Sequence, residues 1–412
     1  MNNFQPYDRF MRQPVERALA YSPVVVLTGA RQTGKTTLVR DLLGQSRRYL
    51  TMDDLDTAER AVREPDALLG TKLPLTLDEV QRTPDLLLAI KRAVDRDRTP
   101  GQFLLTGSAN LALMRSVSES LAGRAVYQTL MPMTASETRG RGGHGLWDVL
   151  LDHPEQCEDA PSLSVDLPSL LLAGGFPPAA LEPRDDARSL WFEGYVRTYL
   201  ERDIQALTAI ERLADFRRFL RLTAMRTGKL MNQSDIARDA GLAQATAHRY
   251  FALLEVSYLL ARVPAYAANA TKRMVKSPRL FMVDTGLACH LAGIGTVEQV
   301  MASDMVGFLA ENLLLQDLYA WQETRTPKPE ILYWRTTSGK EVDFVIEAGD
   351  TLLPVEVKTS RRARLDDSQG LRAFLDDYPG KARHGILVYA GETVERLTSK
   401  IWAVPFSLAL GL

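Results

Sequence analysis

The sequence predicts an α/β protein in which two α/β domains flank a helical middle region. From Val24 to about Leu130, short apolar runs alternate with amphipathic stretches, a pattern typical of a largely parallel sheet covered by helices. After residues 174–178, apolar residues recur at helical spacing. Beyond about Gly307, a helix, three strands, a helix and a strand are expected. These three observations indicate separate N-terminal and C-terminal α/β domains.

Length and composition are those of a soluble globular protein of more than one domain. A chain of 412 residues is too long for one ordinary core. No stretch approaches the ~20 apolar residues of a membrane span, and residues 1–20 lack the apolar region of a secretory signal. Only Cys157 and Cys289 occur, which excludes a disulfide framework and fits a reducing cytoplasm. Because the net charge is −1, binding of nucleic acid would require a local basic patch.

The N-terminal part is expected to contain four strands and a crossover helix. Pro84 opens a stretch with apolar residues at helical spacing, as expected for a helix between two parallel strands. Residues 138–168 mix Gly, Pro and acids without periodicity and are interpreted as an insertion or long loop. The expected strands are Val24 to Thr28, Tyr49 to Met52, Leu73 to Leu77 and Phe103 to Thr106.

The first expected strand runs directly into a phosphate-binding motif. Residues 29–36 fit the pattern GxxxxGK[ST], and a helix is expected to follow. In such a loop, glycines allow backbone N–H groups to wrap phosphates, the lysine reaches the β- and γ-phosphates, and the hydroxyl of residue 36 ligates Mg²⁺. The expected contacts with ATP are Gly29, Ala30, Arg31, Gln32, Thr33, Gly34, Lys35, Thr36 and Thr37.

Five further residues are candidates for the chemistry of ATP hydrolysis. Asp78 is expected to hold Mg²⁺ through water, and Glu79 is expected to polarise the attacking water. An acidic strand end facing solvent is the alternative, but its occurrence together with the phosphate-binding motif favours the catalytic interpretation. Thr106 and Ser108 lie where the γ-phosphate is expected, either as phosphate sensors or as parts of a simple turn. Arg124 is a candidate for neutralising transition-state charge across a subunit boundary, with an ordinary surface arginine as the alternative.

A helix, a turn and a second helix are expected between Asn232 and Glu255. Ser234 can cap the first helix, and Gly241 can adopt the positive φ of the turn. Winged-helix DNA-binding modules have this layout, with a wing that the basic loop ending at Arg279 can supply. The alternative is a protein-interaction element or a lid of the ATPase. The residues expected to face DNA are Gln244, Thr246, His248, Arg249, Lys272, Arg273 and Lys276.

The C-terminal part is expected to bring ionisable residues together from three elements. Glu311 lies in an expected helix, and Asp343 lies on the second strand of an expected hairpin. Glu356 and Lys358 lie on a third strand, where residues two apart share a face. This order resembles the PD-(D/E)xK nuclease superfamily, in which carboxylates bind magnesium and the lysine orients or activates water. The alternatives are a charged pair on a solvent face and a fold retained for binding alone.

Segments along nearly the full length carry a further family resemblance. They include VVVLTGARQTGKTTLVRDL, LTLDEVQRTPDLLLAIKRAVD, SLAGRAVYQTLMPMTASE, KSPRLFMVDTGLACHL and GKEVDFVIE. In these segments the chain resembles the prokaryotic AAA-type ATPases that carry a C-terminal domain of uncharacterised function. The resemblance implies an AAA-like fold with ATP and Mg²⁺ as ligands. It also favours a homo-oligomer, with a hexamer as the expected form, and a role for Arg124 across the subunit boundary.

Together these features predict a cytoplasmic, DNA-associated, oligomeric motor or switch that hydrolyses ATP to ADP and phosphate. Nuclease activity is left open. The alternative is a nucleotide-dependent protein-interaction switch whose last two regions only bind partners. The expected regions are an AAA-like core over 1–137, an insertion and helical linker over 138–210, a winged-helix-like module over 211–300 and a nuclease-like domain over 301–412.

Overall fold

A computed structural model describes residues 6–70, 74–107, 121–141, 147–160, 163–200, 213–269, 273 and 276–412. Ser108 and Lys272, two of the candidate site residues, lie outside these described residues. The chain forms two compact units, one of Met1–Pro132 with Val256–Tyr258 and one of Met133–Glu255 with Leu259–Leu412. In the described part of the chain, no helix is long and apolar enough to cross a membrane.

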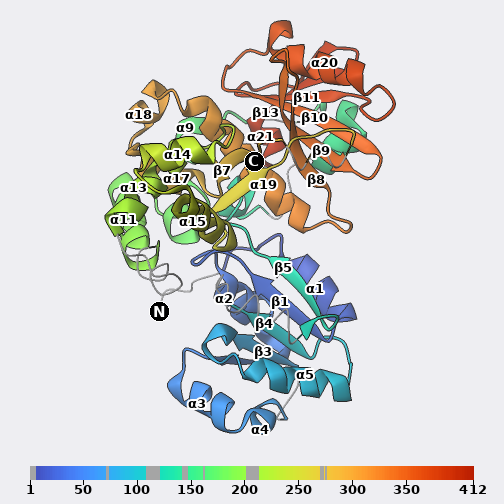
Figure 1. The fold of residues 1–412 in the computed structure, drawn as a ribbon. Helices are drawn as coiled ribbons and strands as arrows, with labels where there is room; N and C mark the ends of the chain where they lie inside the picture. The colour runs from blue at the N-terminus through green and yellow to red at the C-terminus, as the bar shows by residue number, and fades with distance from the viewer. Residues whose placement is uncertain are drawn as a thin grey trace. The chain divides into compact units, whose positions relative to one another are not determined.

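The first unit is built on a five-stranded sheet in the order β2-β3-β4-β1-β5, and all of its pairings are parallel (Figure 1). The four expected strands are present, although β3 begins two residues later than expected, and β5 is an additional edge strand. Because parallel strands end at the same edge, the residues that follow β1, β3 and β4 gather there. The strands are β1 Val24–Thr28, β2 Arg48–Thr51, β3 Leu75–Asp78, β4 Phe103–Thr106 and β5 Ala125–Thr129.

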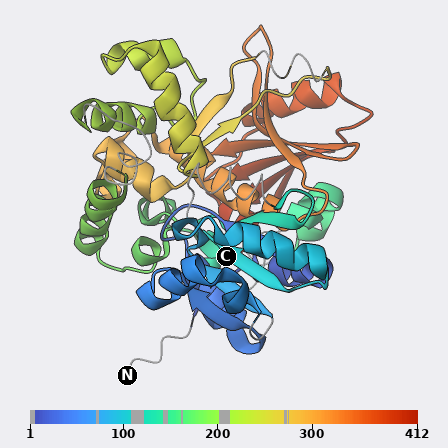
Figure 2. The same cartoon turned by 60° about the horizontal axis from the view of Figure 1, so that its bottom comes forward.

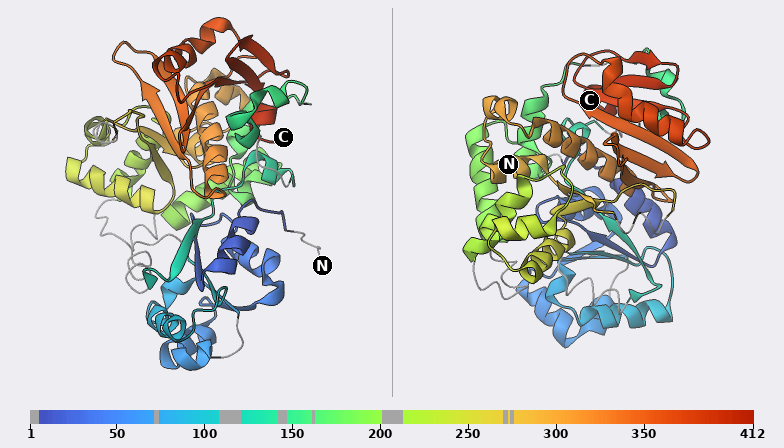
Figure 3. Two further views of the ribbon diagram at one scale, coloured as in Figure 1. Left: turned by 90° about the vertical axis from the view of Figure 1, so that its right-hand side faces the viewer. Right: turned by 45° about the horizontal axis from the view of Figure 1, so that its top comes forward.

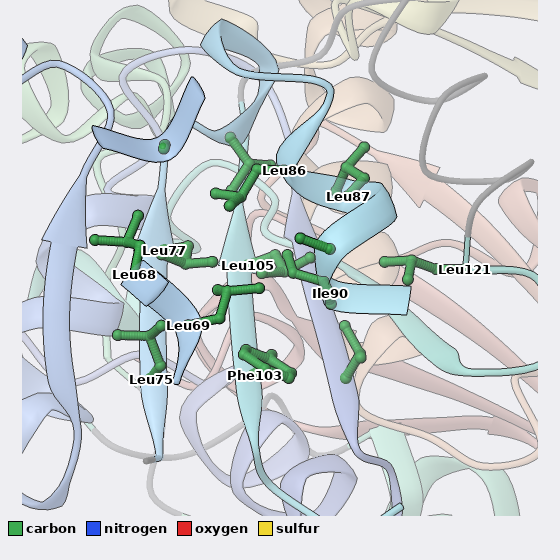
Figure 4. Packing of buried hydrophobic residues seen from close by; sticks show 14 of the residues in the cluster. Leu68, Leu69, Leu75, Leu77, Leu86, Leu87, Ile90, Phe103, Leu105 and Leu121 are labelled. Atoms are coloured by element: carbon green, nitrogen blue, oxygen red, sulfur yellow. The ribbon is translucent and has the colours of Figure 1, made fainter. Parts of the chain in front are cut away.

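Helices pack against this sheet (Figure 2). Apolar side chains alternate along β1 and supply cores on both faces of the sheet. On one face, Leu86 and Ile90 of α5 pack with Leu77 and Leu105 of the sheet (Figure 4). On the other face, Val15 of α1 packs with the alternate β1 residues. The helices are α1 Arg12–Tyr21, α2 Lys35–Thr37, the π-helix η1 Leu38–Leu42, η2 Gly44–Ser46, α3 Leu55–Arg63, α4 Pro65–Leu69, η3 Val80–Arg82 and α5 Leu86–Arg96.

The second unit begins with short helices, two of which lie in residues 138–168. The interpretation of this segment as a long loop was wrong, because it contains α8 and η4, and Trp147 of α8 is fully buried and donates its indole N–H to Asp317 at 3.1 Å. Tertiary packing therefore stabilises a helix too short to produce a periodic pattern. The elements are α7 Ala135–Thr138, α8 Trp147–Asp152, η4 Pro154–Cys157, α9 Leu167–Ala173, α10 Pro177–Ala180, α11 Asp185–Gly194 and the π-helix η5 Tyr195–Leu200.

The middle of this unit contains the expected helix, turn and helix. Gly241 has a φ of +65° in the turn. The N-cap of α14 is Asn232, which accepts from the N–H of Asp235, and not Ser234 as expected. Strands β6 and β7 form an antiparallel pair, and Arg279 is the buried first residue of β7, so it does not belong to an exposed basic loop. The elements are α13 Leu213–Ala224, α14 Gln233–Asp239, α15 Gln244–Val256, β6 Leu260–Val263, β7 Arg279–Met282, α17 Thr285–Ala292 and α18 Val297–Ala302.

The C-terminal part contains a six-stranded mixed sheet in the order β12-β13-β11-β10-β9-β8. Helix α20 covers one face through Leu371 and Phe374, and α19 packs from the other face (Figure 3). The expected strands β8 to β11 are present, whereas β12, β13 and α21 were not expected. The elements are α19 Val306–Glu323, β8 Glu330–Arg335, β9 Glu341–Ala348, β10 Thr351–Lys358, η6 Leu365–Ser368, α20 Gln369–Asp377, β11 Gly385–Tyr389, β12 Glu395–Thr398, β13 Ile401–Pro405 and α21 Phe406–Ala409.

Candidate functional site

Residues 29–36 form a tight loop between β1 and α2, and glycines occupy the positions that require them. Gly29 and Gly34 have φ values of +140° and +94°, which side chains other than glycine rarely adopt. A Cβ atom at Gly29 would lie 2.3 Å from the carbonyl oxygen of Leu130. Gln32 also has a positive φ, +63°, and such conformations are common where a loop forms a binding site. The loop therefore has the backbone conformation expected of a ligand-binding loop.

Lys35 is enclosed by this loop. Its side chain is buried, and its Nζ donates to the carbonyl oxygens of Gly29 at 3.1 Å and Ala30 at 2.7 Å. Burial lowers the pKa of Lys35 to about 8, against the opposing effect of the charges of Glu79 and Asp78. A lysine that points into the loop is suited to an anionic phosphate.

Asp78, at the end of β3, is the centre of a network of hydroxyl groups. Its Oδ2 accepts from the Thr36 hydroxyl at 2.8 Å and from the Tyr49 phenol at 2.7 Å. Its Oδ1 accepts from the hydroxyl of Thr106, at the end of β4. Mg²⁺ prefers oxygen ligands, and the paired oxygens of Thr36 and Asp78 fit such an ion beside the loop. Tyr49 was not identified from the sequence, because a tyrosine in a half-buried strand has no distinguishing pattern.

Glu79 occupies a left-handed backbone conformation, with φ 58° and ψ 41°. Its backbone N–H donates to the Thr106 hydroxyl at 3.4 Å, and its side chain accepts from Gln81. A non-glycine residue in this conformation is strained by roughly 1–3 kcal/mol, and such strain is concentrated at functional sites. Thr106 thus connects the backbone of Glu79 to the carboxylate of Asp78.

Arg9 is a further residue of this site that was not identified from the sequence. It is buried just before α1, and its guanidinium donates to the carbonyl oxygens of Thr33 at 2.7 Å and Met131 at 2.8 Å. The phosphate-binding loop is therefore tied to the segment that follows β5. No local motif marks this role, because Arg9 is 24 positions from Thr33 and 122 positions from Met131 in the sequence.

Arg124 lies on the side of the same sheet where its parallel strands begin, opposite to the side of the phosphate-binding loop. It immediately precedes β5, whose first residue Ala125 is opposite Val24, the first residue of β1. The guanidinium of Arg124 pairs with Asp95, and this pairing raises the pKa of Arg124. The structure thus does not bring Arg124 together with Lys35, which follows the other end of β1.

The candidate DNA-facing residues of α15 lie on its surface, but Arg273 does not fit that role. Gln244, His248 and Arg249 are exposed and Thr246 is partly buried; Lys276, farther along, is exposed. Arg273 is only 18% exposed and pairs with Glu347 at 3.0 Å and with Glu330 at 3.3 Å. Its guanidinium also lies over the Tyr266 ring. The expectation for Arg273 is therefore corrected, because the two carboxylates use its charge within the second unit.

In the C-terminal part, Arg279 occupies the space between two of the candidate carboxylates. It pairs with Glu311 of α19, and its Nη1 lies 3.3 Å from Asp343 Oδ1 on β9. The other oxygen of Asp343 accepts from the backbone N–H of Val357 at 2.9 Å. The guanidinium Nε donates to the carbonyl oxygen of Gly228 at 2.7 Å, which holds Arg279 in place. Glu311 and Asp343 thus share one cation, which is supplied by the protein itself.

Glu356 and Lys358 of β10 share a face and form an ion pair at 2.6 Å. Within the described residues, Glu356 Oε2 is buried and has no hydrogen-bond partner. Burial, with a contribution from Asp343, raises the pKa of Glu356 to about 8. The four candidate residues are neighbours, but the part of the chain that the structure describes contains no group of three or more His, Cys, Asp or Glu side chains that could hold a metal ion. The structure thus adds Arg279 to the four residues expected at this place.

Three families match successive parts of the chain. Residues 21–139 match the family described as AAA domain. Residues 164–298 and 306–409 match two families described as domains of unknown function, DUF8612 and DUF4143.

Relatives and a solved structure extend this comparison. The uncharacterized protein Rv2008c of Mycobacterium tuberculosis is 33% identical over 394 residues, which is 95% of this chain and 82% of the relative. The uncharacterized protein Mb2031c of Mycobacterium bovis gives the same values. The Walker-type ATPase PABY2304 of Pyrococcus abyssi covers 70% of this chain and 99% of its own at 15% identity, with a TM-score of 0.44. A similarity that low between structures says nothing about function.

Proposed function

The chain belongs to the same family as the mycobacterial proteins Rv2008c and Mb2031c and carries a P-loop ATPase domain of the AAA type, and we propose that it hydrolyses ATP with Mg²⁺. The observation that carries the proposal is the 2.8 Å hydrogen bond between Thr36 and Asp78. It joins the end of the phosphate-binding loop to the end of β3, where a carboxylate is needed for the metal ion.

Each residue at this edge of the sheet has a role that follows from its chemistry. Lys35 binds the β- and γ-phosphates through its ammonium group. Thr36 and Asp78 hold Mg²⁺, which when bound neutralises charge on the phosphates. Glu79 accepts a proton from, or orients, the attacking water. Thr106 positions Asp78 and Glu79 relative to each other through its hydroxyl.

Mg²⁺-dependent release of phosphate from ATP by the purified protein tests this proposal. Lys35→Ala is expected to abolish tight nucleotide binding, because it removes the cation inside the loop. Lys381→Ala provides a matched control, since Lys381 is an exposed lysine of the second unit. Near-normal hydrolysis by Lys35→Ala would remove the P-loop from the mechanism.

The ATPase is proposed to act as an oligomeric switch that contacts DNA through the module of α13, α14 and α15. The helix α15 follows a glycine turn, presents an exposed polar face and is followed by a two-stranded sheet, which supports this proposal because winged-helix proteins use such a helix in the major groove. A gel shift of duplex DNA at increasing salt, with and without ATP, tests it. Arg249→Ala is expected to weaken the complex. Binding that is absent at low salt in every nucleotide state would favour the alternative, a protein-interaction switch.

For the C-terminal domain, a role in binding is favoured over cleavage. Arg279 already pairs with Glu311 and Asp343, two of the carboxylates that a nuclease would offer to metal ions. Removing one partner from a buried ion-pair network destabilises the fold by more than the formation of the network stabilises it, because the remaining charge is left buried without a partner. The domain is therefore proposed to serve as a folded binding platform, and divalent-dependent cleavage is the competing function.

A further inference from the structure

We propose that Tyr49 is a positioning residue for Asp78 and that it couples Mg²⁺ binding to nucleotide binding. The inference rests on the proposed ATPase function, since it concerns the same site. Tyr49 lies on β2, two residues before Thr51, which is opposite Asp78 in the sheet. Its phenol oxygen reaches Asp78 Oδ2 at 2.7 Å.

The contact is directed by the packing of the Tyr49 ring. The ring packs against the apolar cluster that contains Leu38 and Leu43. This packing directs the hydroxyl group at Asp78. A phenol is un-ionised at physiological pH, so the hydroxyl of Tyr49 is the donor in this contact and the carboxylate of Asp78 is the acceptor.

Tyr49 and Thr36 donate to the same oxygen of Asp78, and only one of them is expected to ligate the metal ion. When Mg²⁺ is bound, Thr36 presents its oxygen to the ion. Tyr49 can keep its hydrogen bond throughout, because its ring lies outside the phosphate-binding loop. Together with Thr106 on the other carboxylate oxygen, it fixes the rotation of the Asp78 side chain. A carboxylate fixed in this way is organised for the ion before the ion arrives.

The test is Tyr49→Phe, which removes one hydroxyl and keeps the ring. The affinity of a fluorescent ADP analogue is measured in Mg²⁺ and in EDTA, and the ratio of the two affinities gives the coupling. The coupling is expected to fall by about tenfold, which is the usual effect of losing one hydrogen bond to a charged group. Affinity in EDTA is expected to remain unchanged, because the contacts of Lys35 with the phosphates remain. Tyr21→Phe is the matched control, since Tyr21 is 84% exposed.

A purely structural role of Tyr49 has a different signature. It would weaken binding equally in Mg²⁺ and in EDTA and lower the melting temperature, and this result would overturn the inference. A second measurement is the Mg²⁺ dependence of ATP hydrolysis, in which Tyr49→Phe should need about tenfold more Mg²⁺ and regain the wild-type kcat at saturation. In a double variant, Tyr49→Phe should add little to the loss of coupling caused by Asp78→Asn.

The failure of this inference and of the ATPase proposal can be told apart. A wild-type protein that releases no phosphate from ATP in Mg²⁺ would overturn the ATPase proposal and the inference with it. A wild-type protein that hydrolyses ATP but binds the analogue equally in Mg²⁺ and in EDTA would overturn the inference alone. A wild-type protein with strong coupling that Tyr49→Phe retains in full would overturn the role of Tyr49 alone.

Discussion

Arg124 and Asp95 form a two-point ion pair, with Nε–Oδ1 and Nη2–Oδ2 distances of 2.6 and 3.0 Å. Arg124 lies where β5 begins, whereas the phosphate-binding loop follows the end of the adjacent parallel strand β1. A strand of this length spans roughly 16 Å. Arg124 is therefore too far from the nucleotide of its own subunit to act on it, and any catalytic role requires a neighbouring subunit.

If Arg124 acts across a subunit boundary, two inactive variants should restore activity when mixed. Arg124→Ala lacks the arginine and Lys35→Ala lacks the nucleotide site, so one type of mixed interface contains both groups. ATP hydrolysis is expected to rise above that of either variant alone, with a maximum near equal proportions. Asp95→Asn frees Arg124 without removing it and serves as the control. Mixed oligomers that form but show no recovery at any ratio would exclude this role.

Glu79→Gln is expected to separate binding from hydrolysis. The amide cannot accept the proton of the attacking water, so the rate should fall by about 10²–10⁴-fold. The contacts of Lys35 and Thr36 remain, so ATP affinity should stay within about twofold of the wild-type value. Equilibrium binding and single-turnover hydrolysis measured on the same preparation check both parts. Equal losses of affinity in Glu79→Gln and Lys35→Ala would contradict the division of roles.

The affinity for ADP should fall above about pH 8. Burial lowers the pKa of Lys35 to about 8 in the free protein, whereas bound phosphates favour the protonated lysine and raise its pKa. Below pH 8 the proton is already present, so affinity is flat. Above pH 8 binding must take up a proton, and affinity falls by up to about tenfold per pH unit. Titrations from pH 7 to 9.5 test this, with Lys35→Arg as the control, because arginine keeps its charge throughout. A flat wild-type profile would contradict the prediction.

Gly175→Ala should destabilise the second unit. An added Cβ would lie 2.2 Å from both Gln316 Nε2 and the Met133 carbonyl oxygen. The glycine backbone is also fixed by hydrogen bonds, since its N–H donates to Asp284 at 2.6 Å. The expected loss is about 1–3 kcal/mol, as for overpacking of a well-packed interior. Urea denaturation of Gly175→Ala and of Gly307→Ala gives the comparison, because a Cβ at Gly307 meets nothing within 4 Å. Equal stability of the two variants would show that the site relaxes freely.

The parts of the fold that were predictable from the sequence are those in which the signal is local. The glycines of the loop directly follow β1, and the acids Asp78 and Glu79 lie at the end of β3, so each signal spans only a few residues, and the structure has these elements with small shifts in bounds. Strand β5 was not predicted, because its residues are partly exposed and show neither a buried run nor a clean alternation. Helix α8 was not predicted because the burial of Trp147 depends on a helix far along the chain.

The candidate sites show the same division. The hydroxyl of Thr36 and the carboxylate of Asp78 were expected to cooperate because each belongs to a known motif. The roles of Tyr49 and Arg279 arise from contacts with residues distant in sequence, and a lone tyrosine or arginine carries no motif. For Arg273 the sequence predicted a role that the structure does not support. Its place in a basic loop suggested contact with DNA, but Glu330 and Glu347, which are distant in sequence, pair with it.

The buried network around Arg279 gives the last prediction. Arg279→Gln removes the cation that Glu311 and Asp343 share, and it leaves two buried carboxylates without that charge. Loss of one partner from a buried ion pair costs about 3–5 kcal/mol, so unfolding of this variant should begin at a clearly lower urea concentration. Asp343→Asn keeps the shape of the side chain and removes one negative charge. Its loss of stability should be smaller, because Arg279 still pairs with Glu311.

Cleavage assays on the same variants decide between the two functions of this domain. Wild-type protein incubated with single- and double-stranded DNA in Mg²⁺ or Mn²⁺ is expected to leave the DNA intact, with and without ATP, because Arg279 already pairs with Glu311 and Asp343. ATP hydrolysis should persist in Asp343→Asn, since the two sites belong to different units. Divalent-dependent cleavage by the wild type that Asp343→Asn abolishes would instead establish a nuclease, because removal of that single carboxylate charge lowers metal affinity without changing side-chain volume. Cleavage that persists in Asp343→Asn would place the activity at another site or in a contaminant, and the assignment of the carboxylates to binding would stand.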